Sequence, residues 1–258
     1  MERKKSKRSG KGRRFLLLFL MVSALAAGSY SCRECRKQME QDKKQDEIRK
    51  IQGKRDRLAE SLAGRNHDLA GYLSIPDTSF SYPVMQRKGE DEYYLHRDFD
   101  GNYSFYGTPF LDARCRMTSD NLIIYGHNIN GGRMFGFLQA YRKEGFYKKH
   151  PEIVLVTKEG REIYRIVSVV TTDTSSLLYS FTDVFNGKEY RKNVKSILSQ
   201  SLYGTDAGEK LKQEMEQSSN REFFHSRQFI LLSTCRTGEG TNARLLVVGS
   251  RKRKDMRK

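Results

Sequence analysis

The residues with the clearest chemical potential lie at the ends of two apolar segments. The run Phe229–Cys235 ends at a thiol, and the run Leu122–Tyr125 leads through Gly126 into His127. Runs of four to eight β-favouring apolar residues, closed by glycine and small polar residues, are typical of buried strands that end in loops. The sequence therefore predicts Cys235 and His127 at strand ends, where they could face one another across a groove.

A third group follows the thiol. The apolar run Arg244–Val248 predicts a neighbouring strand that begins with a guanidinium near Cys235. A nearby cation favours the thiolate, which is the reactive form of cysteine, and an imidazole is the usual general acid and base. Cys235, His127 and Arg244 are therefore the candidate catalytic residues. The other four histidines lie outside this strand-end context: His67, His96, His150 and His225.

The charge distribution excludes a nucleic-acid-binding function. The formal net charge of the 258 residues is +17. Residues 1–14 hold eight Lys and Arg against Glu2, and residues 251–258 hold six against Asp255. A nucleic-acid-binding domain carries its basic stripe on the folded body, whereas here the basicity lies mostly in the two tails. We expect no nucleic-acid partner.

The four cysteines are spaced too unevenly for a disulfide framework. They are Cys32, Cys35, Cys115 and Cys235. Cys32 and Cys35 have CxxC spacing, but no second pair completes a metal site. We expect neither a metal nor an organic cofactor.

The N-terminal segment predicts export. A basic leader, residues 1–14, precedes the uncharged residues 15–32. This stretch is long enough to span a bilayer core and also fits a cleaved signal peptide. In both cases the positive leader stays in the cytoplasm. We expect a single-pass protein of the cell membrane with its catalytic domain outside the cell.

The rest of the chain predicts a charged helix followed by a mostly β domain. In residues 33–68 a narrow apolar stripe indicates a helix, which either forms a solvated stalk or packs on the domain. From 69 to 250, eight short β-like runs predict a closed eight-stranded barrel. The runs are Gly71–Ile75, Tyr82–Gln86, Tyr106–Leu111, Leu122–Tyr125, Ile153–Thr157, Ile163–Val170, Phe229–Thr234 and Arg244–Val248. A short helix is expected over Met134–Tyr141, a helical insertion over residues 174–225, and a basic tail over 251–258.

Three motifs resemble the active-site motifs of sortases, the cysteine transpeptidases of Gram-positive cell surfaces. They are Leu231–Cys235, Arg244 nine residues further on, and Tyr125–Asn128. The chain resembles class B sortases in particular, through the helical insertion before the cysteine strand and through Gly71–Asp77, Tyr82–Val84, Tyr93–Leu95, Phe99–Gly101 and Gly107–Asp112. One position departs from the family, because the usual Thr-Leu-x-Thr-Cys motif begins with Leu231 here.

The resemblance implies a mechanism and a set of contacts. Cys235 attacks the carbonyl carbon of a threonine in a sorting signal and forms a thioester. His127 protonates the leaving amine and later deprotonates the incoming one. Arg244 holds the substrate backbone or stabilises the oxyanion. The residues expected to contact the signal are Ser233, Thr234 and Asn128.

The resemblance also implies the partners. These are secreted proteins that carry an Asn-Pro-x-Thr-like or a Leu-Pro-x-Thr-Gly-like sorting signal, and an amine acceptor from a peptidoglycan precursor or a pilin. Class B relatives favour the Asn-Pro-x-Thr type. The resemblance implies no cofactor.

Two other functions fit the same residues. The first is a secreted thiol hydrolase or protease that lets water resolve the thioester. The second is a tethered β-barrel binding module in which Cys235 is only a core residue. Diversion of the product by an added amine separates the first from a transpeptidase, and reactivity of Cys235 toward a thiol reagent separates the second.

Overall fold

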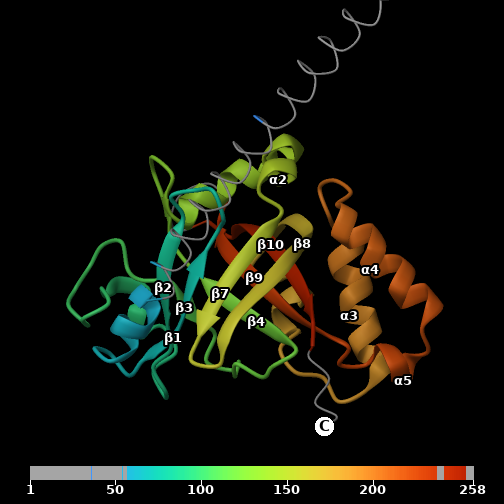
Figure 1. Cartoon of the computed structure of the whole chain (residues 1–258), viewed down its shortest axis with the longest axis horizontal. Coiled ribbons are helices and arrows are strands. Elements are labelled where there is room, and N and C mark those ends of the chain that lie inside the picture. The colour runs from blue at the N-terminus through green and yellow to red at the C-terminus, as the bar shows by residue number, and fades with distance from the viewer. Residues whose placement is uncertain (1–35, 37–53, 55–56, 237–240, 254–258) are drawn as a thin grey trace, which may run out of the picture. The chain divides into compact units, whose positions relative to one another are not determined.

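Eight strands close into a barrel in the computed structural model, which describes residues 57–236 and 241–253 together with Arg36 and Lys54. The order around the barrel is β1-β2-β3-β4-β9-β10-β8-β7 (Figure 1). The strands are β1 Leu69–Ser74, β2 Ser81–Met85, β3 Phe110–Leu111, β4 Asn121–Tyr125, β7 Glu152–Thr157, β8 Gly160–Asp173, β9 Arg227–Cys235 and β10 Ala243–Lys252. The predicted closed eight-stranded barrel is confirmed.

The third strand is much shorter than the sequence predicts. Only Phe110 and Leu111 of the expected strand Tyr106–Leu111 are in β3. Gly107 has a φ of +58°, and a Cβ at this position would lie 2.2 Å from the carbonyl oxygen of Leu95. Backbone in the left-handed region turns the chain, which explains why the strand begins only after this glycine.

The barrel core is built from strands that are buried on both faces. Every residue of β9 from Gln228 to Thr234 is buried, because its inner side chains fill the barrel and its outer ones lie under helices. Leu231 is completely buried and stands opposite Val248 of β10. Leu231, where the sequence departs from the family motif, is therefore a core residue.

Short elements connect the strands. Outside the barrel lie the hairpin β5 Asn128–Ile129 with β6 Arg133–Met134, the 3-10 helices η1 Tyr93–His96, η2 Phe135–Arg142 and η3 Leu177–Ser180, and the helices α2 Glu144–Lys149, α3 Gly187–Ser199, α4 Asp206–Gln217 and α5 Asn220–Phe223. The short helix expected over Met134–Tyr141 is η2, displaced by one residue. The hairpin β5–β6 was not predicted.

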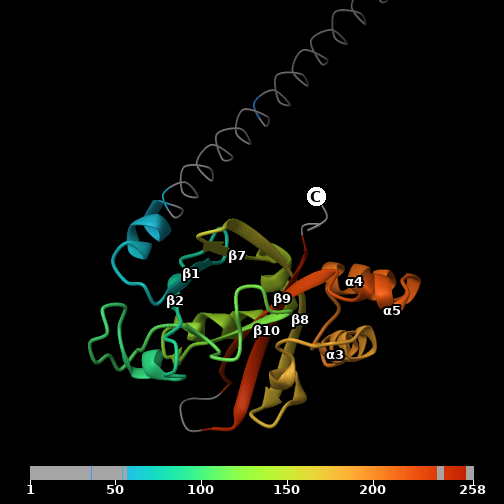
Figure 2. The ribbon, with the colours of Figure 1, turned by 90° about the horizontal axis from the view of Figure 1, so that it is seen from below.

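The predicted helical insertion contains α3, α4 and α5, which lie together on one side of the barrel (Figures 1 and 2). Tyr190, Val194 and Ile197 form the buried face of α3, as their spacing predicts. Leu202 shares that spacing but lies beyond the end of α3 and is 45% exposed. The sequence predicted one helix, and α4 is a second one that begins at the N-cap residue Thr205.

The helix before the barrel packs against it. Residues 57–63 are helical, and Ala59 and Leu62 contact a cluster on β1 and β7. This end of the predicted N-terminal helix is therefore not a solvated stalk. The predicted leader and the membrane segment 15–32 lie outside the described residues. Among the residues that are described, no helix is both long and apolar enough to cross a membrane.

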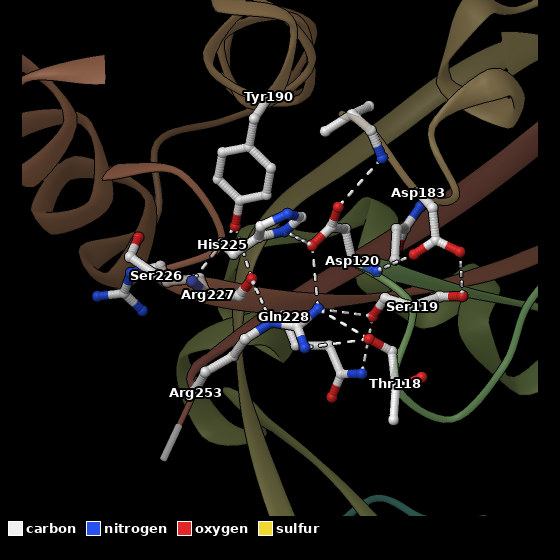
Figure 3. Close-up of polar contacts among 12 residues, drawn as sticks. Thr118, Ser119, Asp120, Asp183, Tyr190, His225, Ser226, Arg227, Gln228 and Arg253 are labelled. Carbon is white, nitrogen blue, oxygen red and sulfur yellow. Dashed lines mark hydrogen bonds and ion pairs between the residues drawn. The ribbon is translucent and has the colours of Figure 1, made fainter. Parts of the chain in front are cut away.

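A buried carboxylate ties together the starts of β4 and β9. Asp120 directly precedes β4 and is fully buried. Its Oδ1 accepts hydrogen bonds from Nδ1 of His225 and Nη2 of Arg253, and its Oδ2 accepts one from the backbone N–H of Val184 (Figure 3). His225 lies just before β9 and Arg253 just after β10. This network fixes the strand ends that are remote from Cys235, and it shows that Arg253 belongs to the fold.

Candidate active site

The register of two parallel strands brings the imidazole and the thiol together. Strands β4 and β9 pair in parallel, with Tyr125 opposite Ser233. His127 and Cys235 each lie two residues beyond this pair and therefore emerge at the same edge of the barrel. The backbone pairing continues past the strand end, since the N–H of Gly126 donates to the carbonyl of Ser233 at 3.2 Å.

A different pairing sets Arg244 opposite Cys235. Strand β10 runs antiparallel to β9, with Arg244 directly opposite Cys235. Side chains of directly opposite residues lie on the same face, with Cβ atoms about 4.5 to 5.5 Å apart. Nη1 of Arg244 donates to the backbone carbonyls of Thr241 and Ala243. Within residues 57–236 and 241–253, Nη2 has no hydrogen-bond partner.

The three predicted catalytic side chains line one cavity of about 710 Å³, a size typical of ligand-binding clefts. Among the described residues the lining is Asp91, Glu92, Leu95, His96, Phe110, Asp112, Ala113, Arg114, Tyr125, Gly126, His127, Thr174, Tyr179, Ser233, Thr234, Cys235 and Arg244. The cavity thus joins η1, the segment after β3, the ends of β4 and β9, the region of η3, and the start of β10.

The backbone of the thiol residue is held from two sides. Cys235 is a free, partly exposed cysteine, and its carbonyl oxygen accepts hydrogen bonds from Nδ2 of Asn128 at 2.9 Å and Nε2 of Gln139 at 3.0 Å. Thr234 is buried, and its hydroxyl donates to the carbonyl of Gly126 at 2.9 Å. The polar side chains of Asn128 and Thr234 therefore bond to backbone beside the cavity, and Asn128 is not among the lining residues.

The imidazole is held from η1. Nε2 of His127 lies 2.8 Å from the carbonyl oxygen of Leu95. Because a carbonyl oxygen only accepts, Nε2 carries a proton, and Nδ1 is the nitrogen through which the neutral ring can gain one. The ring of His96 is tilted by 31° to that of His127, with 5.4 Å between the centroids. A second, exposed imidazole therefore adjoins the first.

Two stacked tyrosines form a wall of the cavity. The rings of Tyr125 and Tyr179 are 6.2 Å apart and nearly parallel. The hydroxyls of Tyr179 and Ser233 are 2.7 Å apart and share a hydrogen bond. Burial raises the pKa of Tyr179, although the hydrogen bond with Ser233 and the charge of Arg244 act in the opposite direction. The Tyr179 hydroxyl therefore stays protonated and presents a polar group to the cavity.

The ion pair between Arg114 and Asp112 is hydrogen-bonded to both tyrosines of this wall. Nη2 of Arg114 lies 2.7 Å from Oδ2 of Asp112, which also accepts the hydroxyl hydrogen of Tyr125 at 2.8 Å. Burial opposes ionisation of Asp112, but the hydrogen bonds from Arg114 and Tyr125 outweigh it and hold the pKa below its ordinary value. Arg114 also donates to the carbonyl of Tyr179 at 3.0 Å.

Sequence reasoning missed several of these residues. Tyr179 lies in the helical insertion, where no motif singles it out. His96 was separated from His127 by its sequence context, although the two rings are in contact. Asp112 ends the segment Gly107–Asp112, which resembles class B sortases. That resemblance could have pointed to Asp112 and to Arg114 two residues further on.

The remaining candidate side chains lie elsewhere. Burial raises the pKa of the Cys115 thiol to about 11, and its Sγ donates to the carbonyl of Asn121. His150 contacts the carbonyl of Pro76, and His225 binds the buried carboxylate at the start of β4. Cys32 and Cys35 lie outside the described residues.

A closed barrel with a thiol, an imidazole and a guanidinium at one cavity fits a cysteine-dependent acyl-transfer enzyme. The sortase domain model matches residues 73–252, and the chain belongs to the sortase family. Sortases are cysteine transpeptidases of Gram-positive cell surfaces that act on sorting-signal substrates and amine acceptors. The chain is accordingly a cysteine transpeptidase, and its relatives are class B sortases.

Two characterised relatives and two solved structures illustrate the similarity. Sortase B of Staphylococcus aureus is 31% identical over 65% of this chain and 68% of its own length. Sortase B of Listeria monocytogenes is 32% identical over 71% of this chain and 68% of its own. The structure of the S. aureus sortase B–substrate complex matches with a TM-score of 0.65 and 26% identity, over 84% of this chain and 100% of that one. Sortase B of Clostridium perfringens matches with a TM-score of 0.62 and 25% identity, over 74% and 97%.

Proposed function

We propose that Cys235 is the nucleophile, His127 the general acid and base, and Arg244 the oxyanion donor of a class B sortase reaction. One observation carries the proposal: all three side chains line a single cavity at the edge of the barrel. The thiol is free and partly exposed, as a nucleophile must be.

In the first half-reaction, the Cys235 thiolate attacks the carbonyl carbon of the signal's threonine. The C–N bond after that threonine breaks, His127 donates a proton to the departing amine, and a thioester remains on Sγ. Arg244 donates to the oxyanion, and one such donor contributes about 2.7 to 4 kcal/mol of transition-state stabilisation. The N–H of Arg236 donates to the carbonyl of Ala243 at 2.9 Å, so it is engaged in backbone pairing and Arg244 is the donor that we assign.

In the second half-reaction, an acceptor amine attacks the thioester carbon. His127 takes the proton from the amine, the C–S bond breaks, and the Cys235 thiolate returns while a new amide bond forms. The bond from Nε2 to the carbonyl of Leu95 supports this double role, because it fixes one tautomer and assigns the exchanged proton to Nδ1.

We assign different roles to the three residues expected at the signal. Ser233 contacts the signal as part of the wall that it forms with Tyr179. Thr234 and Asn128 are positioning residues, since their side chains bond to the backbone of Gly126 and Cys235. They hold the thiol and the entrance to the imidazole loop in fixed geometry.

The proposed substrate is a secreted protein with an Asn-Pro-x-Thr-type sorting signal, in preference to Leu-Pro-x-Thr-Gly. Support for this preference comes from the class B relatives, at 31% and 32% identity. The proposed acceptor is an amine of a peptidoglycan precursor or a pilin lysine.

We place the enzyme at the outer face of the cell membrane, with residues 15–32 as a single span and residues 1–14 in the cytoplasm. The support is the sequence pattern, in which eight Lys and Arg precede an uncharged apolar stretch. Residues 33–68 would then connect the span to the barrel. This location puts the enzyme where secreted precursors meet the amines of the cell wall.

The test is mass spectrometry of the protein incubated with Asn-Pro-x-Thr and Leu-Pro-x-Thr-Gly peptides, with and without an amine. We expect a thioester adduct that converts to an amine-linked product, and we expect faster adduct formation with the Asn-Pro-x-Thr peptide. Cys235→Ala should form no adduct, and His127→Ala should form it far more slowly. Arg244→Ala should lower kcat/KM by about a hundredfold or more, as expected for loss of an oxyanion donor.

Two outcomes would count against the proposal. Release of only the hydrolysed peptide in the presence of every amine would favour a thiol hydrolase. Absence of an adduct, together with a Cys235 that resists a thiol reagent, would mean that the chain retains only the barrel.

A further inference from the structure

We infer that four exposed side chains beside His127 form the binding surface for the sugar-bearing part of a cell-wall amine acceptor. They are Tyr103, Phe105 and Tyr106 of the segment before β3, and Arg133 of β6; together we call them the aromatic surface. This inference rests on the proposed function and specifies its second substrate.

The aromatic surface is unusual in its exposure. Tyr103 is 78% exposed, Phe105 57% and Tyr106 43%. Clustered exposed apolar groups are features of interaction sites, and these three rings stand within four residues. Phe105 and Tyr106 meet edge to face, with 5.8 Å between their centroids. Nη1 of Arg133 donates to the Tyr106 hydroxyl at 3.2 Å, which joins the guanidinium to the rings.

Backbone contacts hold the aromatic segment next to the catalytic imidazole. The N–H of Ser104 donates to the carbonyl of His96 at 3.0 Å, and Tyr103 forms a β-bridge with Arg97. The ring of His96 lies against that of His127. Gly107, with its φ of +58°, returns the chain against the Leu95 carbonyl. The rings are therefore presented by an anchored loop.

The hairpin β5–β6 brings Arg133 to the same place. The hairpin begins directly after His127, and the N–H of Phe135 donates back to the His127 carbonyl at 2.9 Å. Arg133 stands on β6, paired with Ile129. Both halves of the aromatic surface are thus connected to His127, one through η1 and the other through the hairpin.

The chemistry of the second half-reaction indicates that the amine acceptor is the molecule that binds the aromatic surface. The base that deprotonates the incoming amine must touch it, so the acceptor's remaining atoms extend over the surface that adjoins His127. The signal instead lies in the cavity, against the Tyr179 wall and Arg244. The aromatic surface is linked to the His127 side of the cavity by backbone bonds, from Ser104 to His96 and from Phe135 to His127, and both histidines line the cavity.

The side chains of the aromatic surface are suited to bind the sugar rings of an acceptor. A pyranose ring has flat C–H faces that pack on aromatic rings and a polar rim that bonds to tyrosine hydroxyls. Tyrosine suits such a ligand because it combines an apolar ring with a polar hydroxyl. Arg133 adds a donor for the carboxylates of a muramyl peptide. An acceptor that offered only a lysine or a short glycine peptide would leave these rings without a partner.

The experiment compares two acceptors on the full chain. One is a disaccharide–peptide fragment of peptidoglycan with a free amine, and the other is the same peptide without its sugars. Transfer from a saturating Asn-Pro-x-Thr peptide is followed by mass spectrometry for the unmodified protein and for Tyr103→Ala/Phe105→Ala. The matched control is Phe185→Ala, which removes a phenyl ring that is 91% exposed on the helical insertion.

We expect the double substitution to lower kcat/KM for the sugar-bearing acceptor about fivefold or more, because two of the three ring contacts are lost. Thioester formation and transfer to the sugar-free peptide should stay unchanged, and Phe185→Ala should change neither. An equal loss with both acceptors would assign the surface to peptide, as for a pilin. No loss with either would show that the surface has no part in acceptor binding. Both results overturn the inference.

A binding measurement separates this inference from the proposed chemistry. The sugar-bearing fragment is titrated by calorimetry into Cys235→Ala and into the same protein with Tyr103→Ala/Phe105→Ala. Weaker binding to the second protein supports the aromatic surface even where no thioester forms, a result that would count only against the proposed function. Equal affinity for both proteins overturns the inference.

Discussion

Replacement of Asp120 by alanine should strongly destabilise the barrel without touching the cavity that Cys235 lines. The buried carboxylate accepts hydrogen bonds from His225, Arg253 and the N–H of Val184. Removing one partner of a buried ion pair costs about 3 to 5 kcal/mol, because the remaining charge loses its compensation. The side chains of His225 and Arg253 are 44% and 23% exposed, so water relieves part of this cost. We therefore expect a loss near the lower end, about 3 kcal/mol.

The assay is urea unfolding followed by circular dichroism, since the chain has no tryptophan. The control is Asp100→Ala, which removes an ion pair with Arg65 whose side chains are 56% and 57% exposed. A surface pair of this kind contributes about 0.2 to 1 kcal/mol. If Asp120→Ala lowers the free energy of unfolding no more than Asp100→Ala does, the network does not anchor the strand starts and the reasoning fails.

Three further predictions concern the site. Thr234→Val removes the bond to the Gly126 carbonyl and should lower kcat with little change in KM for the signal peptide; a rise in KM alone would instead indicate direct substrate contact. Under native conditions iodoacetamide should modify Cys235 and spare Cys115, whose buried thiol has a pKa of about 11, and peptide mapping by mass spectrometry checks this. Asp112→Asn tests whether ionisation of Asp112 stabilises the fold. Folding lowers the pKa of this carboxyl, so its contribution to stability is present above the pKa of the unfolded state and is lost as pH falls through the pKa of the folded state. The difference in unfolding free energy between Asp112→Asn and the unmodified protein should therefore be largest near neutral pH and shrink below about pH 4; a difference that is constant with pH would exclude ionisation as its source.

The sequence was most informative where structure depends on local patterns. Every predicted strand has a counterpart in the barrel, because an apolar run bounded by turn residues has few alternatives to a buried strand. Strands β8 and β10 are longer than predicted, whereas β3 is shorter, because Gly107 takes a left-handed conformation that the sequence alone permits but does not require. A single glycine contact with the Leu95 carbonyl thus decided where β3 begins.

Non-local contacts were beyond the reach of the sequence. The sequence shows that Cys235 and His127 each follow a strand. It does not show the parallel pairing of β4 with β9, because these strands are more than a hundred residues apart. Tyr179 shows the same limit, since its role as a cavity wall depends on stacking with Tyr125 and a bond to Ser233. Neither contact leaves a periodic signal in the sequence.

The two neighbours of β9 divide the chemistry between them, and this makes strand register the determinant of the site. The parallel neighbour β4 leads to His127, and the antiparallel neighbour β10 supplies Arg244 opposite Cys235. A slip of one residue between β9 and β10 would place Leu245 or Ala243 opposite the thiol and turn the guanidinium to the other face. Such a slip would also displace the fully buried pairs farther along β9, so the apolar core that stabilises the barrel simultaneously holds Arg244 opposite Cys235.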